Sequence, residues 1–260
     1  MPTTDHFSRQ AALYQASRPD YPPELFSFLA GVAPAGDLAL DCATGNGQAA
    51  LGLARHFAEV VATDLSPAQL AQRRSHPRVH YVAAIAEQLP IADRSVDLVT
   101  VAQALHWLDL PAFFAEIRRI ARPRAVIAAW TYGLARVTPA IVAIVSRLYS
   151  EIVGAYWPPE RALVESGYRD LPFPFEPIPA APLSLRADWP LDRLVGYLGS
   201  WSAVQRCKDA TGSDPVASVR DALAAAWGRP ASRAVVWPLA PSSRQEVSSA
   251  QRTGSGARFD

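Results

Sequence analysis

The sequence predicts an α/β protein built on a doubly wound, mostly parallel sheet. In the first half of the chain, helical patterns separate short apolar segments that have the pattern of strands. These segments lie at 38–42, 59–64, 78–84, 95–103 and 124–130. Strands joined through helices need right-handed crossovers, and such crossovers make neighbouring strands parallel. A sheet of this kind binds its ligand beyond the carboxyl ends of the strands.

Helices are predicted between these strands at 48–57, 66–74 and 110–122. The second of them has a clear beginning, because Ser66 is a good N-cap and Pro67 suits the first helical position. Ahead of the first strand, residues 5–33 are predicted to form two helical pieces, which the prolines of the segment SRPDYPP separate.

The pattern changes after the fifth strand. Residues 134–170 are predicted to be helical and 171–185 extended, followed by helices at 191–207 and 215–227 and a last strand at 233–240. We therefore expect a core with N-terminal lid helices over 1–133, a helical cap with the sixth strand over 134–232, and the last core strand at 233–240. Residues 241–260 have no periodicity and are expected to form a disordered tail.

The composition excludes several kinds of protein. The net charge of +1 over 260 residues indicates neither a nucleic-acid partner nor a membrane surface. The two cysteines do not suggest a disulfide framework. No apolar run approaches the roughly 20 residues that span a bilayer. We expect a cytoplasmic protein with a small-molecule substrate, and the oligomeric state stays open.

A glycine turn after the first strand indicates the ligand. Gly45, Gly47 and Ala50 fit the dinucleotide fingerprint, and Asp64 stands where a carboxylate accepts hydrogen bonds from a ribose. Asp41 disfavours a pyrophosphate, because two charges 4 Å apart interact by about 4 kcal/mol at a dielectric near 20. The same carboxylate favours S-adenosylmethionine, which carries an ammonium, a sulfonium and an adenosine.

Several segments together resemble one family. DCATGNGQ resembles the first motif, D-x-G-x-G-x-G, of class I S-adenosylmethionine-dependent methyltransferases, and VATD resembles their second-strand acidic motif. AAIAEQLPIADRSVDLVTVAQALHW resembles the third- and fourth-strand motifs of the small-molecule subgroup that includes trans-aconitate methyltransferase. The resemblance covers about residues 5–240. It implies a Rossmann-like sheet of seven strands whose last pair is antiparallel, with an inserted helical cap.

The resemblance also implies S-adenosyl-L-methionine as the cofactor and methyl transfer to a small molecule, for which the oxygen of a carboxylic acid is a candidate. Asp41 would lie near the methionine ammonium, Asp64 at the ribose, and Gln103 beside the methionine part. The full set of implied cofactor-binding residues is Tyr14, Arg18, Asp41, Ala43, Thr44, Gly45, Gly47, Asp64, Leu65, Ala86, Glu87, Gln103 and Ala104.

The sequence departs from the family pattern at two turns. Ala43 replaces the first glycine of the first motif, which narrows that turn. Arg-Pro-Arg-Ala at 122–125 replaces the usual Arg-Pro-Gly-Gly, so we expect the turn before the fifth strand to avoid positive φ.

His106 is the candidate catalytic residue, because it follows the fourth strand where an acceptor approaches. It would act as a base only for an acceptor that is protonated; the other interpretation is packing beside Trp107. An aromatic acceptor pocket is expected from Trp107, Trp130, Tyr132 and Trp201, with Trp157 and Tyr197 as further candidates. Candidates to pair with an acceptor carboxylate are Arg186, Arg193 and Arg206. No metal site is predicted.

Two other functions stay open. An NAD-dependent oxidoreductase uses the same glycine turn, although Asp41 argues against it. A catalytically silent protein that only binds S-adenosylmethionine is the other alternative.

Overall fold

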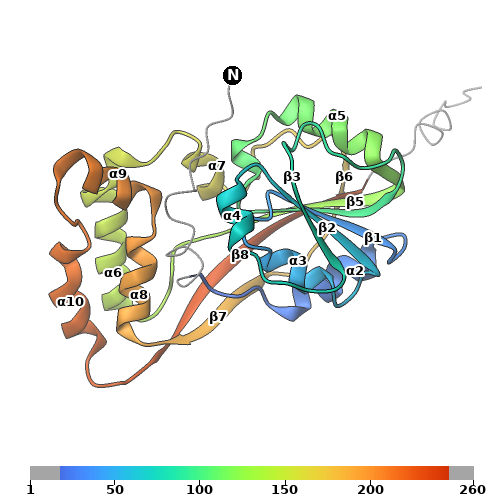
Figure 1. Ribbon diagram of the computed structural model, residues 1–260. Coiled ribbons are helices and arrows are strands. Elements are labelled where there is room, and N and C mark those ends of the chain that lie inside the picture. The colour runs from blue at the N-terminus through green and yellow to red at the C-terminus, as the bar shows by residue number, and fades with distance from the viewer. Residues whose placement is uncertain (1–17, 246–260) are drawn as a thin grey trace, which may run out of the picture.

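The computed structural model describes residues 18–245, and a sheet forms its centre (Figure 1). The strands are β1 (Leu38–Cys42), β2 (Glu59–Asp64), β3 (Val79–Ala83), β4 (Val96–Ala102), β5 (Ala121–Tyr132), β6 (Glu176–Ile178), β7 (Leu183–Trp189) and β8 (Arg233–Gln245). Their order is β3-β2-β1-β4-β5-β8-β6, with β7 also paired to β8. The first five strands run parallel, and β8 is antiparallel to β5, β6 and β7.

The structure confirms the fold class. β7 pairs with residues 233–239 of β8, and β6 pairs with residues 243–245. The two short strands therefore lie along one edge of β8, and the eight strands occupy seven positions across the sheet. This arrangement accounts for the seven strands with an antiparallel last pair that the resemblance implied.

The prediction of a tail beginning at residue 241 is wrong for its first five residues. β8 continues to Gln245, and residues 239–245 pair with β5. The polar composition misled the prediction, because backbone groups between two neighbouring strands find ladder partners whatever their side chains are. Residues 246–260 lie outside the described residues.

Helices cover both faces of the parallel part of the sheet (Figure 1). They are α2 (Pro23–Val32), α3 (Gln48–Leu53), α4 (Pro67–Ala71) and α5 (Leu110–Ile120). The predicted cap of α4 is confirmed, since the Ser66 side chain accepts a hydrogen bond from the Gln69 amide. On the amphipathic α5, Phe113 and Ile117 are buried in the apolar cluster that includes Val99 of β4.

A group of helices stands beside the sheet, where β7 and β8 reach it (Figure 1). These helices and turns are α6 (Pro139–Arg147), η3 (Leu148–Ile152), η4 (Gly154–Tyr156), α7 (Arg161–Glu165), α8 (Leu191–Gly199), α9 (Ser202–Thr211) and α10 (Ala217–Trp227). The predicted helix 191–207 is two helices, because the Ser200 hydroxyl donates to the Tyr197 carbonyl and Trp201 adopts an extended conformation. Within residues 18–245, no helix has the length and hydrophobicity that crossing a bilayer requires.

Both departures from the family pattern adopt left-handed backbone. Ala43 has φ +54°, and Arg124 has φ +69°. The expectation that residues 122–125 avoid positive φ is therefore wrong, and these residues lie within β5 and not in a turn before it. The steric cost of such a residue is about 1–2 kcal/mol, which the folded protein tolerates when the turn geometry requires it.

Candidate functional site

In the glycine loop after β1, the backbone requires glycine most clearly at residue 47. Gly45 has φ +59° and Gly47 has φ +87°. A Cβ atom on Gly47 would lie 2.0 Å from the hydroxyl oxygen of Tyr81. Gly47 therefore lets the loop pack directly on β3, and an L side chain there would force either the loop or Tyr81 to move.

Asp41 organises this loop from beneath. Its Oδ2 accepts hydrogen bonds from the Thr44 hydroxyl at 2.5 Å and from the Ala50 amide at 3.0 Å, and its Oδ1 accepts one from the Thr100 hydroxyl at 2.9 Å. Burial raises the pKa of Asp41 to about 6, and the negative charge of Asp64 also raises it. The residue is 0% exposed, and its expected place near the methionine ammonium stays a prediction. The loop covers the end of β1, and the buried carboxylate holds the loop through these hydrogen bonds.

Asp64 ties the glycine loop to the end of β2. Its Oδ2 accepts a hydrogen bond from the Gly45 amide, and its Oδ1 accepts one from the Ser66 amide, both at 2.8 Å. Leu65 beside it is 38% exposed, although it is a large apolar residue. A half-buried carboxylate next to an exposed leucine is compatible with the predicted contacts to ribose and adenine, which stay predictions.

The remaining predicted cofactor residues lie around the same edge of the sheet. Thr44 is buried and donates its amide to the Thr63 carbonyl, and Ala86 is buried as well. Glu87 accepts a hydrogen bond from the Asp109 amide at 2.9 Å, and Ala104 is half-buried ahead of η2 (Leu105–Trp107). Tyr14 lies outside the described residues.

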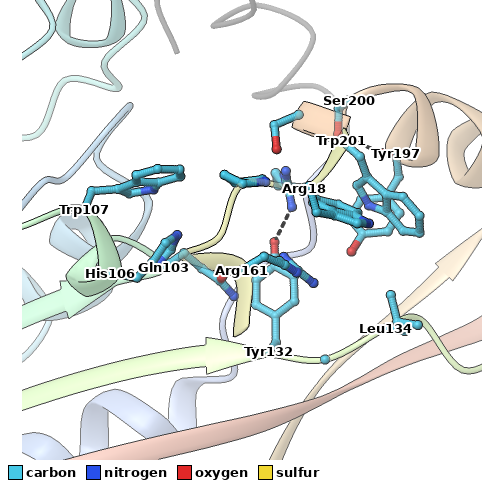
Figure 2. A pocket seen from close by; sticks show the side chains of 14 residues that line it. Arg18, Gln103, His106, Trp107, Tyr132, Leu134, Arg161, Tyr197, Ser200 and Trp201 are labelled. Atoms are coloured by element: carbon cyan, nitrogen blue, oxygen red, sulfur yellow. Dashed lines mark hydrogen bonds between the residues drawn. The ribbon is translucent and has the colours of Figure 1, made fainter. Parts of the chain in front are cut away.

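A cavity of about 80 Å³ opens beyond the ends of β4 and β5 (Figure 2). Eight of the residues named from the sequence line it: Arg18, Gln103, His106, Trp107, Tyr132, Trp157, Tyr197 and Trp201. The Arg18 guanidinium donates to the Tyr132 hydroxyl at 2.9 Å and lies over the Tyr197 ring, 5.3 Å from its centroid. Arg161 adds to the lining, so this pocket combines aromatic rings with two guanidinium groups.

Trp130 is not part of this pocket, contrary to prediction. Its side chain is 0% exposed, and Tyr21 covers it edge-to-face at a centroid distance of 5.5 Å. The position in β5 is the reason, because Tyr132 ends the strand at the pocket whereas Trp130 lies two residues deeper in the sheet.

The three arginines expected to pair with an acceptor carboxylate do not line the pocket. Arg186 and Arg193 are exposed and, like Arg206, do not line the cavity. Arg161 does line it, and sequence reasoning missed this residue. Nothing in the local pattern distinguishes Arg161 from a solvated helical arginine, since only the folded cap brings it to the strand ends.

His106 is neutral in this environment. Its Nδ1 lies 2.8 Å from the Tyr168 hydroxyl, and its ring packs beside Trp107 at 4.7 Å. Burial and, to a smaller extent, the positive charge of Arg161 lower the pKa of His106 to about 3. An imidazole with so low a pKa is a weak proton acceptor near neutral pH.

Gln103 presents an amide donor at the pocket. Its backbone is left-handed, with φ +60°, and its Oε1 accepts a hydrogen bond from the Thr131 hydroxyl at 3.2 Å. Its Nε2 is buried and has no hydrogen-bond partner among the described residues. Strained backbone and an orphaned buried donor are both typical of a ligand site.

Over residues 18–245 there is no cluster of three or more side chains that could hold a metal ion.

A parallel sheet with a glycine loop and two carboxylates at the ends of β1 and β2 defines a protein of the Rossmann-like fold class, in which ligands bind at this edge of the sheet. Comparison with known proteins makes the class specific. Residues 40–129 match the family model described as a methyltransferase domain. A provisionally named methyltransferase of Dictyostelium discoideum is 32% identical over 227 residues, which cover 86% of each chain.

A solved structure agrees along nearly the whole chain. The protein from Anaeromyxobacter dehalogenans, provisionally described as a type II methyltransferase, is 51% identical with a TM-score of 0.84, over 88% of this chain and 98% of that chain. Malonyl-[acyl-carrier protein] O-methyltransferase of Dechloromonas aromatica is 41% identical over 105 residues, or 40% of this chain and 39% of that protein. The chain belongs to the class I S-adenosylmethionine-dependent methyltransferases.

Proposed function

We propose that this methyltransferase transfers the methyl group of S-adenosylmethionine to an oxygen of a small carboxylic acid. The observation that carries the proposal is the pocket beyond β4 and β5, in which Arg18 and Arg161 stand among aromatic side chains. A cavity lined by aromatic rings and guanidinium groups suits a small organic anion, because arginine pairs with a carboxylate through two parallel hydrogen bonds.

The ends of β1 and β2 fit a cationic cofactor. Asp41 and Asp64 are close enough for the charge of Asp64 to raise the pKa of Asp41, so a positive ligand would relieve a repulsion that a pyrophosphate would increase. We propose that the Gly45–Gly47 loop and Asp64 hold the cofactor, with Leu65 at the adenine. When bound, S-adenosylmethionine supplies a methyl group on a sulfonium, whose carbon–sulfur bond breaks as the acceptor oxygen bonds to the methyl carbon.

A carboxylate acceptor also agrees with the state of His106. A carboxylic acid is ionised at neutral pH, so its oxygen attacks without losing a proton, whereas a hydroxyl acceptor needs a base. The low pKa of His106 makes it a poor base. We therefore assign to His106 the positioning of the acceptor and not the removal of a proton.

Two similarities to known methyltransferases also support methylation at an oxygen of a carboxylic acid. The name of the malonyl-[acyl-carrier protein] relative describes methylation at oxygen, although that match spans 40% of this chain. The third- and fourth-strand motifs resemble the subgroup that includes trans-aconitate methyltransferase. Both are weaker support than the pocket, because acceptor choice depends on the cap.

The test is turnover to S-adenosylhomocysteine with a panel of small carboxylic acids, each paired with its amide, its alcohol and its amine. We expect turnover with acids and none with their amides. Turnover with alcohols or amines alone would overturn the carboxylate assignment. Calorimetric binding of S-adenosylmethionine without turnover of any acceptor would favour the catalytically silent alternative, and binding of NAD in its place would favour the oxidoreductase.

A further inference from the structure

Arg161 is held in a fixed plane at the wall of the pocket. Its guanidinium lies over the ring of Trp157, 4.6 Å from the centroid, and over the ring of Tyr149, 5.3 Å from the centroid. Its Nε donates to the Tyr149 hydroxyl at 2.7 Å. An arginine stacked on two rings and bound through Nε has lost most of its rotamer freedom before any ligand arrives.

Tyr149 is itself held from the other side. Its hydroxyl donates to the carboxylate of Glu165, which lies one turn away from Arg161 on α7. Burial raises the pKa of Tyr149 to about 12, so the phenol keeps its proton and its donor direction at neutral pH. The chain from Glu165 through Tyr149 to Arg161 therefore orients the guanidinium without neutralising it.

The terminal nitrogens of Arg161 stay available. Along the part of the chain that the structure describes, neither Nη1 nor Nη2 has a hydrogen-bond partner, and no carboxylate pairs with the group. Two arginines at the opposite end of the sheet differ in this respect. Arg119 pairs with Asp93 and Glu116, and Arg122 pairs with Asp37 and Asp97. A half-buried cation that is oriented but unpaired is suited to an anion from outside the chain.

We propose that Arg161 binds the carboxylate of the methyl acceptor through its two terminal nitrogens and so selects acids over neutral molecules. Tyr149 and Glu165 are positioning residues that aim this group. The inference rests on the proposed function and deepens it, because it assigns the choice of acceptor to one residue of the cap. Figure 2 shows Arg161 in the same pocket as His106, Gln103 and Tyr132.

The experiment compares Arg161→Met, Arg161→Lys and Tyr149→Phe with a matched control, Arg169→Met. Arg169 is an exposed arginine close to α7 that does not line the pocket. Steady-state kinetics use the best acid of the panel and its amide. Calorimetry measures the binding of benzoate to the protein saturated with S-adenosylhomocysteine, as a readout independent of turnover.

We expect Arg161→Met to raise the KM for the acid and the Kd for benzoate by about 10- to 100-fold, as for the loss of a charged hydrogen bond. Its acid-to-amide preference should collapse, while the Kd for S-adenosylmethionine stays unchanged. For Arg161→Lys, the KM for the acid and the Kd for benzoate should lie between those of wild type and Arg161→Met, because an ammonium group keeps the charge but cannot form two parallel hydrogen bonds. Tyr149→Phe should raise KM a few-fold with little change in kcat, and Arg169→Met should match wild type.

Two outcomes separate this inference from the proposed function. If wild type methylates acids but Arg161→Met keeps the wild-type KM and benzoate affinity, the inference is wrong and the proposed function stands. If no acid is methylated, the proposed function fails, and benzoate binding decides the inference. Binding by wild type that Arg161→Met loses would support the anion site, and equal or absent binding in both would overturn it.

Discussion

The two sides of the proposed site, the glycine loop as the cofactor side and the pocket beyond β4 and β5 as the acceptor side, are built differently. On the cofactor side, the loop is held by residues close in sequence, such as Thr44 on Asp41 three residues away and Gly45 on Asp64 nineteen residues away. On the acceptor side, Arg18 meets Tyr132 across 114 residues, and His106 meets Tyr168 across 62. Most of these loop contacts are therefore short in sequence, with the Asp41–Thr100 hydrogen bond across 59 residues as an exception, whereas the pocket contacts depend on how distant segments fold back. Changes in the cap can alter the acceptor without disturbing the loop.

The largest effect on stability is expected at Gly47, because the cofactor side depends on the left-handed backbone at this residue. Gly47→Ala should destabilise the protein by about 2–4 kcal/mol, the sum of left-handed strain and the clash with Tyr81. Urea unfolding measures the change. Gly31→Ala is the matched control, because Gly31 lies in α2 with nothing within 4 Å of its added Cβ. Alanine there should be neutral or stabilising, and equal stability of the two variants would contradict the tight packing of the loop.

A substitution of Asp41 distinguishes the effect of its negative charge on cofactor binding from the effect of its hydrogen bonds on stability. Asp41→Asn should weaken S-adenosylmethionine binding by about tenfold, because a field of one charge at short range is worth on the order of 1–2 kcal/mol. The fold should tolerate the amide, since its nitrogen can donate to the Thr100 hydroxyl, whose single hydrogen can then point to the Leu40 carbonyl. Calorimetry and thermal unfolding measure both quantities. A loss of stability with unchanged affinity would assign Asp41 to the fold alone.

The pH dependence of the same residue has a defined sign. The folded pKa of about 6 exceeds the ordinary value of 3.8, so the folded protein holds a proton that the unfolded chain releases. This contribution to stability is present below about pH 4 and is lost as pH rises through 6. Because a cationic ligand prefers the ionised carboxylate, affinity for S-adenosylmethionine should rise from pH 5 to 7.5 in wild type and rise less in Asp41→Asn.

The smallest effect is expected at His106 on the acceptor side. His106→Gln should lower kcat by less than about tenfold, well short of the 10²–10⁴ that loss of a general base costs. The kcat of wild type should show no change between pH 5 and 8 that reflects titration of a histidine, since the pKa of His106 is lowered to about 3. Pre-steady-state rates at saturating cofactor measure this. A hundredfold loss of kcat in His106→Gln, together with a wild-type kcat that titrates near pH 6.5, would show that His106 acts as a base.

The sequence predicted the secondary structure around the glycine loop with little error. β1 and β2 have the bounds that alternation and apolar content indicated, and Ser66 caps α4 as expected. Such features are readable because each depends on residues within one turn or one strand. The errors at Arg124 and at the start of the tail have a related cause. Tertiary context forced a left-handed arginine and paired a polar segment into the sheet.

By itself, then, the sequence determined the order of strands and helices, the glycine loop and the acidic residues at two strand ends, since local periodicity and turn chemistry specify them. Only the tertiary structure decided that Asp41 lies beneath the loop, that Trp130 is buried and that Arg161 reaches the pocket. These outcomes depend on packing between segments far apart in the chain, and no short-range pattern records which side chains that packing leaves accessible.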